Sequence, residues 1–361
     1  MQWLDRVKFG NGSNGAPTTI TNYFNTFTGT SGQTSGTISA GWVWDAPVLI
    51  HQSQGTGAGQ WELNWGTVSS GTTITLKYPL SYTYGTGAQI VTLHQYTGGT
   101  FSGTHTGTAW NGSYGGIIAL MCNGDLTISG TISVNGIGFR GASGVGVGGG
   151  IDGKQGEGYG SSTYNGTSYN YNYNGGGGGD FQVNQSGGGG GGGNGTAGST
   201  APNSTNAIEG IGGIAAGSAD LTSIVFGGGG GSACTGNDGS GQSGPGGTGG
   251  GAIFIFGKNI TVSGSITSNG SNGSGQIYAS GGSGGGAGGS IIIKCQGATI
   301  GTNKILASAG AGGTTGQGYG GDGGVGRIRV EYADSISGST SPTASTAQVT
   351  TLKSQIYGGM I

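Results

Sequence analysis

Four segments of the chain share one pattern, in which a Gly-containing pair precedes a strand with alternating apolar positions. The pairs are Gly115–Gly116, Gly250–Gly251, Gly288–Gly289 and Val325–Gly326. Alternation with a period of two places successive side chains on opposite faces of a strand. The last three copies start at 251, 289 and 326, which are 38 and 37 residues apart, and periods of this size indicate stacked repeats. We predict rungs of a β-solenoid-like stack near residues 115–136, 250–270, 288–307 and 325–332.

Alignment of these four segments gives two columns that are apolar in every copy. The first column holds Ile118, Ile253, Ile291 and Ile328, and the second holds Leu120, Ile255, Ile293 and Val330. A third column holds Cys122, Gly257, Cys295 and Tyr332. The opposite face varies from apolar in the first copy to Arg327, Arg329 and Glu331 in the last. Constant columns are what a shared core requires, so we expect both to be buried in one continuous stack.

Residues 1–110 carry nearly all of the Trp and show ordinary strand patterns, such as the alternation over 73–78. The run Val48–Gln52 resembles the run Val91–Gln95, which indicates a weak internal duplication. We predict an all-β protein with an N-terminal β-sandwich-like or barrel-like domain over 1–110. A Gly-rich repeat domain then covers 111–334, and a Ser/Thr-rich tail covers 335–361.

Long Gly-rich stretches separate the predicted rungs, over residues 137–249, 271–287 and 311–324. Chains without side chains can approach closely and bond to several neighbours as extended helices with the geometry of polyproline II. Ordering one residue costs roughly 1–2 kcal/mol, so only a dense lattice of backbone hydrogen bonds could hold these stretches. Two interpretations stay open: packed polyglycine II-type loops, or flexible Gly linkers.

The composition excludes several classes of protein. The chain contains 95 Gly in 361 residues, and only 7% of residues are charged, whereas about 25% is usual. Eleven Lys+Arg in 361 residues are too few for a nucleic-acid-binding surface. Six Pro and no strict three-residue period exclude collagen. The 6 Trp, 15 Tyr and 9 Phe argue against a disordered chain.

Sequence motifs for catalysis or metal binding are absent. No CxxC, GxSxG or P-loop occurs, and Gly320–Gly324 matches a calcium-binding nonapeptide only in part. We interpret His51 and His94 as strand residues without a third metal ligand, and Cys122, Cys234 and Cys295 as buried thiols. We interpret the acidic residues of the Gly-rich part as turn residues or solubilising charges: Asp152, Glu157, Asp180 and Asp238. We therefore expect no enzyme, no cofactor and no metal.

One segment has the composition of a recognition loop. Tyr164, Tyr169, Tyr171 and Tyr173 alternate with Asn and Ser, and Phe181 follows them. Tyr offers a large contact area at a low cost in conformational entropy, and this composition also suits stacking on sugars. The alternative is that these rings pack beneath the Gly lattice. We predict that these five aromatic residues form the binding surface.

Neither end of the sequence carries a membrane signal that we can identify. No apolar segment follows Met1–Val7 and no run of 18 apolar residues occurs, so we expect neither a signal peptide nor membrane insertion. Delivery to the outside of a cell would then use another route, such as phage assembly followed by lysis.

The Gly stretches over 137–325, with variable segments 162–174 and 180–186 between them, resemble the adhesins at the tips of tailed-phage long fibres. The resemblance implies an N-terminal domain that attaches to the fibre. It also implies a polyglycine II domain whose terminal loops bind host surface receptors. The long inserts and the predicted rungs depart from that family. The chain is also similar to Gly-rich repeat proteins of bacterial surfaces and extracellular matrices.

Three functions remain as hypotheses. The first is a phage tail-fibre or virion-surface adhesin that binds a host receptor or glycan. The second is a homo-oligomeric or polymeric subunit of an extracellular fibre or surface layer. The third is a polysaccharide depolymerase. A chain with so few charges must gain affinity from aromatic contacts and multivalent display, which favours binding over catalysis. The expected absence of a signal peptide favours the first hypothesis over the second.

Overall fold

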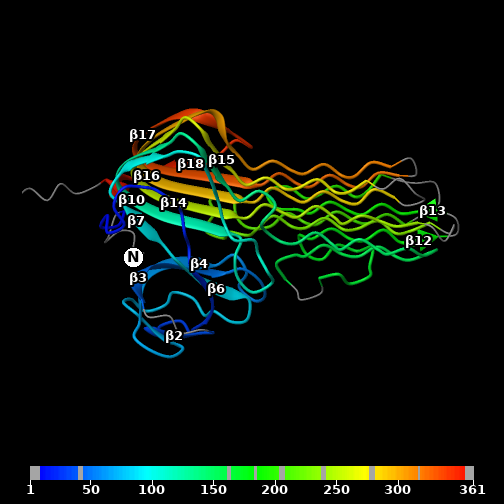
Figure 1. Ribbon diagram of the computed structural model, residues 1–361, viewed down its shortest axis with the longest axis horizontal. Helices are drawn as coiled ribbons and strands as arrows, with labels where there is room; N and C mark the ends of the chain where they lie inside the picture. The colour runs from blue at the N-terminus through cyan, green and yellow to red at the C-terminus, as the bar shows by residue number, and fades with distance from the viewer. Residues whose placement is uncertain are drawn as a thin grey trace, which may run out of the picture.

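The computed structural model consists of a barrel, a curled parallel sheet and a long bundle of Gly-rich segments (Figure 1). It describes residues 9–39, 44–160, 164–182, 185–202, 208–236, 241–275, 281–315 and 318–353. Asp238, Ser162 and the end of the predicted tail, 354–361, lie outside the described residues. In Figure 1 the barrel lies beside the sheet, and the bundle extends from the sheet away from both.

The N-terminal part forms a closed six-stranded barrel in the order β1-β2-β5-β4-β3-β6. The strands are β1 (Phe24–Thr28), β2 (Ser35–Ile38), β3 (Trp44–Gln52), β4 (Trp61–Val68), β5 (Thr73–Leu76) and β6 (Ala88–Thr92). All neighbouring pairs are antiparallel, and β1 closes the barrel by pairing with β6. Of the two forms that the sequence left open, sandwich-like or barrel-like, the structure has the barrel. Val48 and Ile50 point into its core, which also contains Phe27 and Tyr84.

The second part is a parallel sheet of ten strands that curls around an apolar core. Its strands are β7 (His94–Tyr96), β8 (Gly99–Phe101), β9 (Thr104–Thr106), β10 (Ile117–Ile128), β11 (Thr131–Ser133), β14 (Ala252–Val262), β15 (Ser265–Thr267), β16 (Ser290–Leu306), β17 (Arg327–Ser341) and β18 (Ser345–Gln348). The long strand β16 pairs with both β14 and β15, which makes the sheet turn. The strands β7, β8 and β9 join this sheet, although they precede residue 110. Part of the predicted tail also belongs to it, as the end of β17 and as β18.

The two predicted columns lie directly across neighbouring strands of this sheet. Ile118 pairs with Ile253, Ile253 with Ile291, and Ile291 with Ile328. The second column is paired in the same way along β10, β14, β16 and β17, and its residues are Leu120, Ile255, Ile293 and Val330. All eight side chains are buried in one cluster.

The opposite face of the sheet varies along its width because different partners cover it. Over β10 and β14, Met121, Phe254 and Phe256 pack against the outer face of the barrel, and the rings of Trp61 and Phe254 lie 5.2 Å apart. Over β16 and β17 the same face carries charged side chains, and Lys294 Nζ lies 3.0 Å from the Glu331 carboxylate. Docking of the barrel thus accounts for the apolar residues of the first copies.

The third part is a bundle of extended Gly-rich segments that run side by side (Figure 1). Backbone hydrogen bonds of 2.8–2.9 Å link segments far apart in sequence, from Gly190 N to Gly177 O, from Gly231 N to Gly190 O and from Gly284 N to Gly231 O. One short antiparallel pair, β12 (Phe181–Gln182) with β13 (Gln185–Ser186), lies at the far end. A short 3-10 helix covers Thr350–Leu352. Within the described ranges, no helix is long and apolar enough to cross a membrane.

The segments pack so closely that a methyl group does not fit between them. A Cβ atom on Gly190 would lie 2.4 Å from the carbonyl oxygen of Ile211, well inside van der Waals contact. By contrast, a Cβ on Gly146 would meet no atom within 4 Å. The two glycines therefore offer a matched pair of substitutions.

We expect Gly190→Ala to lower the free energy of unfolding by about 1–3 kcal/mol or more, as overpacking does. Gly146→Ala should leave it unchanged or raise it by about 0.4–1 kcal/mol, because the unfolded chain loses freedom. Denaturant unfolding of both variants measures the difference. Equal stability of the two variants would mean that the segments are not packed as described.

A buried polar chain joins the barrel to the base of the bundle. His51 Nε2 donates to the carbonyl of Ile224 at 2.8 Å, and the Ser53 hydroxyl lies 2.8 Å from His51 Nδ1. Gln89 Nε2 in turn donates to the Ser53 hydroxyl at 2.7 Å. Because the carbonyl can only accept, Nε2 carries a proton. Burial lowers the pKa of His51 to about 4. His51 and His94 lie in different sheets, so they do not form one site.

This histidine should make stability depend on pH. In the unfolded chain the imidazole protonates near pH 6.5, whereas in the folded protein it stays neutral down to about pH 4. The contribution of the neutral His51 ring to the free energy of unfolding is therefore complete above pH 6.5. It falls by about 3 kcal/mol as the pH is lowered to 4. His51→Gln should be less stable than the wild type at pH 7, and the gap should narrow by that amount at pH 4. A gap independent of pH would contradict the buried neutral ring.

Candidate functional site

Tyr169, Tyr171 and Tyr173 form a stripe of exposed rings on the side of the bundle, which we call the tyrosine stripe. Their exposed fractions are 40%, 45% and 44%. Their backbone joins the bundle, since Ile211 N donates to Tyr169 O at 2.8 Å and Ile214 N donates to Tyr173 O at 2.9 Å. No hydrogen bond to the three phenol hydroxyls is seen among the described residues. The stripe therefore offers three aromatic faces and three free hydroxyls to a ligand.

Asparagine side chains on the opposite side of this segment fix it to the bundle. Asn174 Nδ2 donates to the carbonyls of Gly193 and Phe226, both at 3.0 Å, and its Oδ1 accepts from Tyr159 N at 3.0 Å. Asn172 Nδ2 donates to Gly156 O at 3.1 Å. Both Asn side chains are buried. Over residues 171–174 the rings thus lie outside and the amides inside, whereas Asn170 is exposed.

Tyr173 occupies a backbone position that favours glycine. Its φ is 55°, in the left-handed region, which costs a residue with a side chain roughly 1–2 kcal/mol. Asn172 and Gly175 exchange two backbone hydrogen bonds of 2.8 Å, so Tyr173 is the first residue of a two-residue turn, where Gly is usual. Its ring packs on Tyr159, with the centroids 5.2 Å apart. A strained residue of this kind motivates a functional hypothesis.

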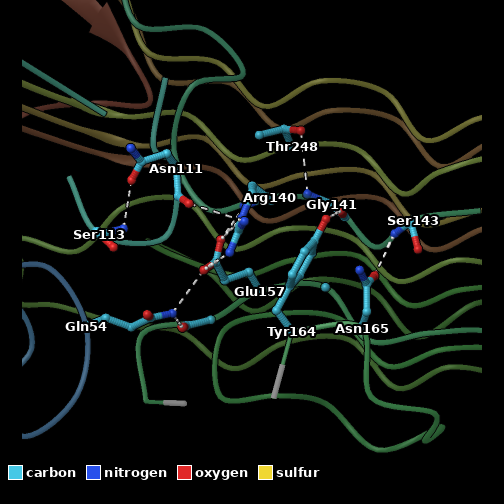
Figure 2. A network of polar contacts seen from close by, with 12 residues as sticks. Gln54, Asn111, Ser113, Arg140, Gly141, Ser143, Glu157, Tyr164, Asn165 and Thr248 are labelled. Carbon is cyan, nitrogen blue, oxygen red and sulfur yellow. Dashed lines mark hydrogen bonds and ion pairs between the residues drawn. The ribbon is translucent and has the colours of Figure 1, made fainter. Parts of the chain in front are cut away.

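Tyr164 lies apart from the stripe, in a polar junction near the barrel (Figure 2). Its ring stacks on the Arg140 guanidinium at 4.2 Å, and its hydroxyl donates to Gly141 O at 3.2 Å. Arg140 binds Glu157 through Nε and Nη2, both at 2.9 Å, and Gln54 of the barrel donates to the same carboxylate at 3.2 Å. Tyr164 therefore packs within the structure rather than facing a ligand.

This junction corrects our interpretation of Glu157 as a turn residue or solubilising charge. Glu157 is 1% exposed, and its carboxylate also accepts from the backbone N–H of Arg140 at 3.0 Å. The hydrogen bond to Glu157 raises the pKa of Arg140. The Arg140 side chain is 35% exposed, so the pair is buried only at Glu157, and removing Arg140 would leave a buried carboxylate without its counter-ion. The sequence offered no signal for this pair beyond the scarcity of charges.

Phe181 lies at the far end of the bundle, in β12 (Figure 1). Ile151, Ile208 and Tyr319 are exposed apolar residues of the same end, and their exposed fractions reach 56% at Tyr319. Ile208 pairs with Asp180, next to Phe181, and Tyr319 O lies against Gly188, two residues after β13. We call these four residues the distal cluster. In the sequence, Ile151, Ile208 and Tyr319 could have been noticed as large apolar residues within Gly- and Ser-rich stretches.

Reactive groups are scarce in the part of the chain that the structure describes. No group of three or more His, Cys, Asp or Glu side chains there could hold a metal ion. Cys122, Cys234 and Cys295 are free and buried. Burial raises the pKa of Cys234 and of Cys295 to about 12, which keeps both thiols protonated.

Comparison with known proteins identified no relative. No family model matches the chain, and neither a curated protein nor a solved structure matches it. The geometry of the tyrosine stripe and of the distal cluster is thus the basis for a functional proposal.

The backbone of Tyr173 can be tested with two substitutions. Tyr173→Ala removes the ring and keeps the strain, whereas Tyr173→Gly removes both. We expect the Gly variant to exceed the Ala variant in free energy of unfolding by about 1 kcal/mol, because relief of the left-handed strain, roughly 1–2 kcal/mol, outweighs the extra freedom of Gly in the unfolded chain, about 0.4–1 kcal/mol. Denaturant unfolding measures this difference. An Ala variant at least as stable as the Gly variant would show that Tyr173 is not held in the left-handed region.

Proposed function

We propose that this protein is a structural receptor-binding protein, an adhesin of a phage tail fibre or of a virion surface. The observation that carries the proposal is the elongated bundle, which displays the distal cluster far from the barrel (Figure 1). A scaffold whose interior is mostly glycine backbone leaves most of its chemistry to its flank and its end. In this proposal the barrel serves attachment or assembly, and the exposed aromatic residues bind the receptor.

We further propose that the bundle is a polyglycine II lattice built on a β-solenoid-like stack. Two observations support the lattice. Its segments bond to neighbours far apart in sequence without forming named strands, and glycine backbones lie where a Cβ would clash. The paired columns of β10, β14, β16 and β17 support the stack.

The chemistry of the tyrosine stripe favours a neutral or weakly charged surface ligand, such as a host glycan or a receptor loop. Tyr rings supply apolar contact area, and their hydroxyls supply hydrogen bonds. Two of the few charged residues, Glu157 and Arg140, bind each other in an internal ion pair and so do not attract a charged ligand. Affinity would then come from several weak aromatic contacts and from repeated copies on one particle.

A subunit of an extracellular fibre or surface layer is the second candidate. The edge strand β18 favours it, since β18 pairs only with β17 among the described residues. An edge of this kind can accept a strand from another chain. In that case the tyrosine stripe would contact a neighbouring subunit, and the purified protein would form filaments.

Labelled protein applied to a panel of bacterial strains tests the proposal. The wild type should label at least one strain. The variant Tyr169→Ser/Tyr171→Ser/Tyr173→Gly should bind at least tenfold more weakly with an unchanged unfolding midpoint. The barrel variant Tyr82→Ser, which also removes an exposed Tyr, serves as the control and should bind normally.

Three results would contradict the proposal. Undiminished labelling by the folded triple variant would show that the receptor contact lies outside the tyrosine stripe. Filaments in electron micrographs without labelling of any strain would favour the fibre subunit. Release of oligosaccharides from a host polysaccharide would show an enzyme.

A further inference from the structure

Arg327 is the one arginine of the described ranges that has no carboxylate partner. Arg140 pairs with Glu157, and Arg329 lies 3.3 Å from Glu331. No carboxylate of the described chain lies within 4.0 Å of the Arg327 guanidinium. A protein with so few charged residues thus keeps one cation unpaired at the start of β17.

The Arg327 side chain is held in one orientation. Its Nε donates to the carbonyl of Ala216 at 2.8 Å. The guanidinium is half-buried, and this burial lowers its pKa from the ordinary value. With Nε occupied, the Nη1 and Nη2 edge remains for a ligand, and this edge matches the two oxygens of a carboxylate.

Arg327 is one of the residues that line an open cavity of about 190 Å³. Thr343 and Ser345 supply hydroxyls, and Ala219 and Pro342 supply apolar walls. Ser345 Oγ accepts from Arg329 Nη1 at 2.8 Å, so its own proton is free to be donated. No acidic side chain lines the cavity. Because drug-sized ligands occupy about 300–1,000 Å³, this volume corresponds to a ligand the size of a single sugar unit.

We propose that this cavity binds the carboxylate of an acidic saccharide of the uronic acid class. Arg327 would hold the carboxylate through two parallel N–H···O bonds, and the Thr343 and Ser345 hydroxyls would bond to hydroxyls of the sugar ring. One unpaired cation matches one negative charge, whereas a phosphate monoester carries −1.5 to −2 at pH 7. The inference rests on the proposed receptor-binding function, but it places a second contact on the sheet, apart from the tyrosine stripe.

Calorimetric titration of the full chain with galacturonic acid tests the assignment. The wild type should bind one equivalent saturably, and Arg327→Gln should bind at least tenfold more weakly. Arg327→Lys should also lose affinity, because it keeps the charge but not the two-pronged edge. Lys304→Gln is the matched control, since Lys304 is exposed and the substitution changes the net charge equally. The methyl ester of the sugar should bind at least tenfold more weakly than the acid.

Four results would overturn the assignment: no saturable binding by the wild type, equal affinity in Arg327→Gln, equal affinity for the methyl ester, or acetate binding as tightly as galacturonate. The last would indicate a simple carboxylate site, such as one for the end of another chain. Unfolding midpoints of the variants separate loss of binding from loss of folding. Cells still labelled through the tyrosine stripe, without binding of galacturonate, would refute this inference and leave the proposed function standing.

Discussion

The bundle depends on backbone hydrogen bonds between glycine segments, and these bonds need a template. Ordering each residue costs roughly 1–2 kcal/mol, whereas each bond returns about 0.5–1.5 kcal/mol, so one bond per residue does not by itself offset the ordering of that residue. The curled sheet supplies this template. Gly250 N donates to Ala287 O, and Gly288 N donates to Gly324 O. These bonds continue the order β14, β16, β17 into the bundle, so the buried columns of the sheet fix the spacing at which the glycine segments start.

A lattice of this kind has no room for side chains, and this constraint determines where chemistry can occur. Amide and hydroxyl groups enter only where they replace a backbone bond, as Asn174 does between Gly193 and Phe226. Charged groups are expelled or paired, as in the junction of Arg140 and Glu157. Large side chains gather on the flank and at the far end, where the tyrosine stripe and the distal cluster lie. The proposed recognition would therefore take place at the surface of a scaffold whose interior is mostly glycine backbone.

The sequence predicted the parts of the fold that are local or repeated. Period-two alternation after each Gly pair was enough to align Ile118 with Ile253, Ile291 and Ile328, which the structure places on neighbouring strands. Closure of the barrel depends on the pairing of β1 with β6, between Phe24 and Val91, and no local pattern encodes a contact of that separation. For the same reason the sequence could not show that Tyr164 stacks on Arg140 while Tyr169 and Tyr171 face outward.

The strain at Tyr173 shows how such a scaffold can be adapted to binding. A chain with 95 glycines places a tyrosine at a turn position where glycine would be free of strain. The strain is tolerated because Asn172 and Asn174 on either side are locked into the bundle, so the turn cannot relax. The same anchors hold the ring on Tyr159 before any ligand arrives. Little conformational entropy would then be lost on binding, and preorganisation of this kind strengthens weak aromatic contacts without additional surface.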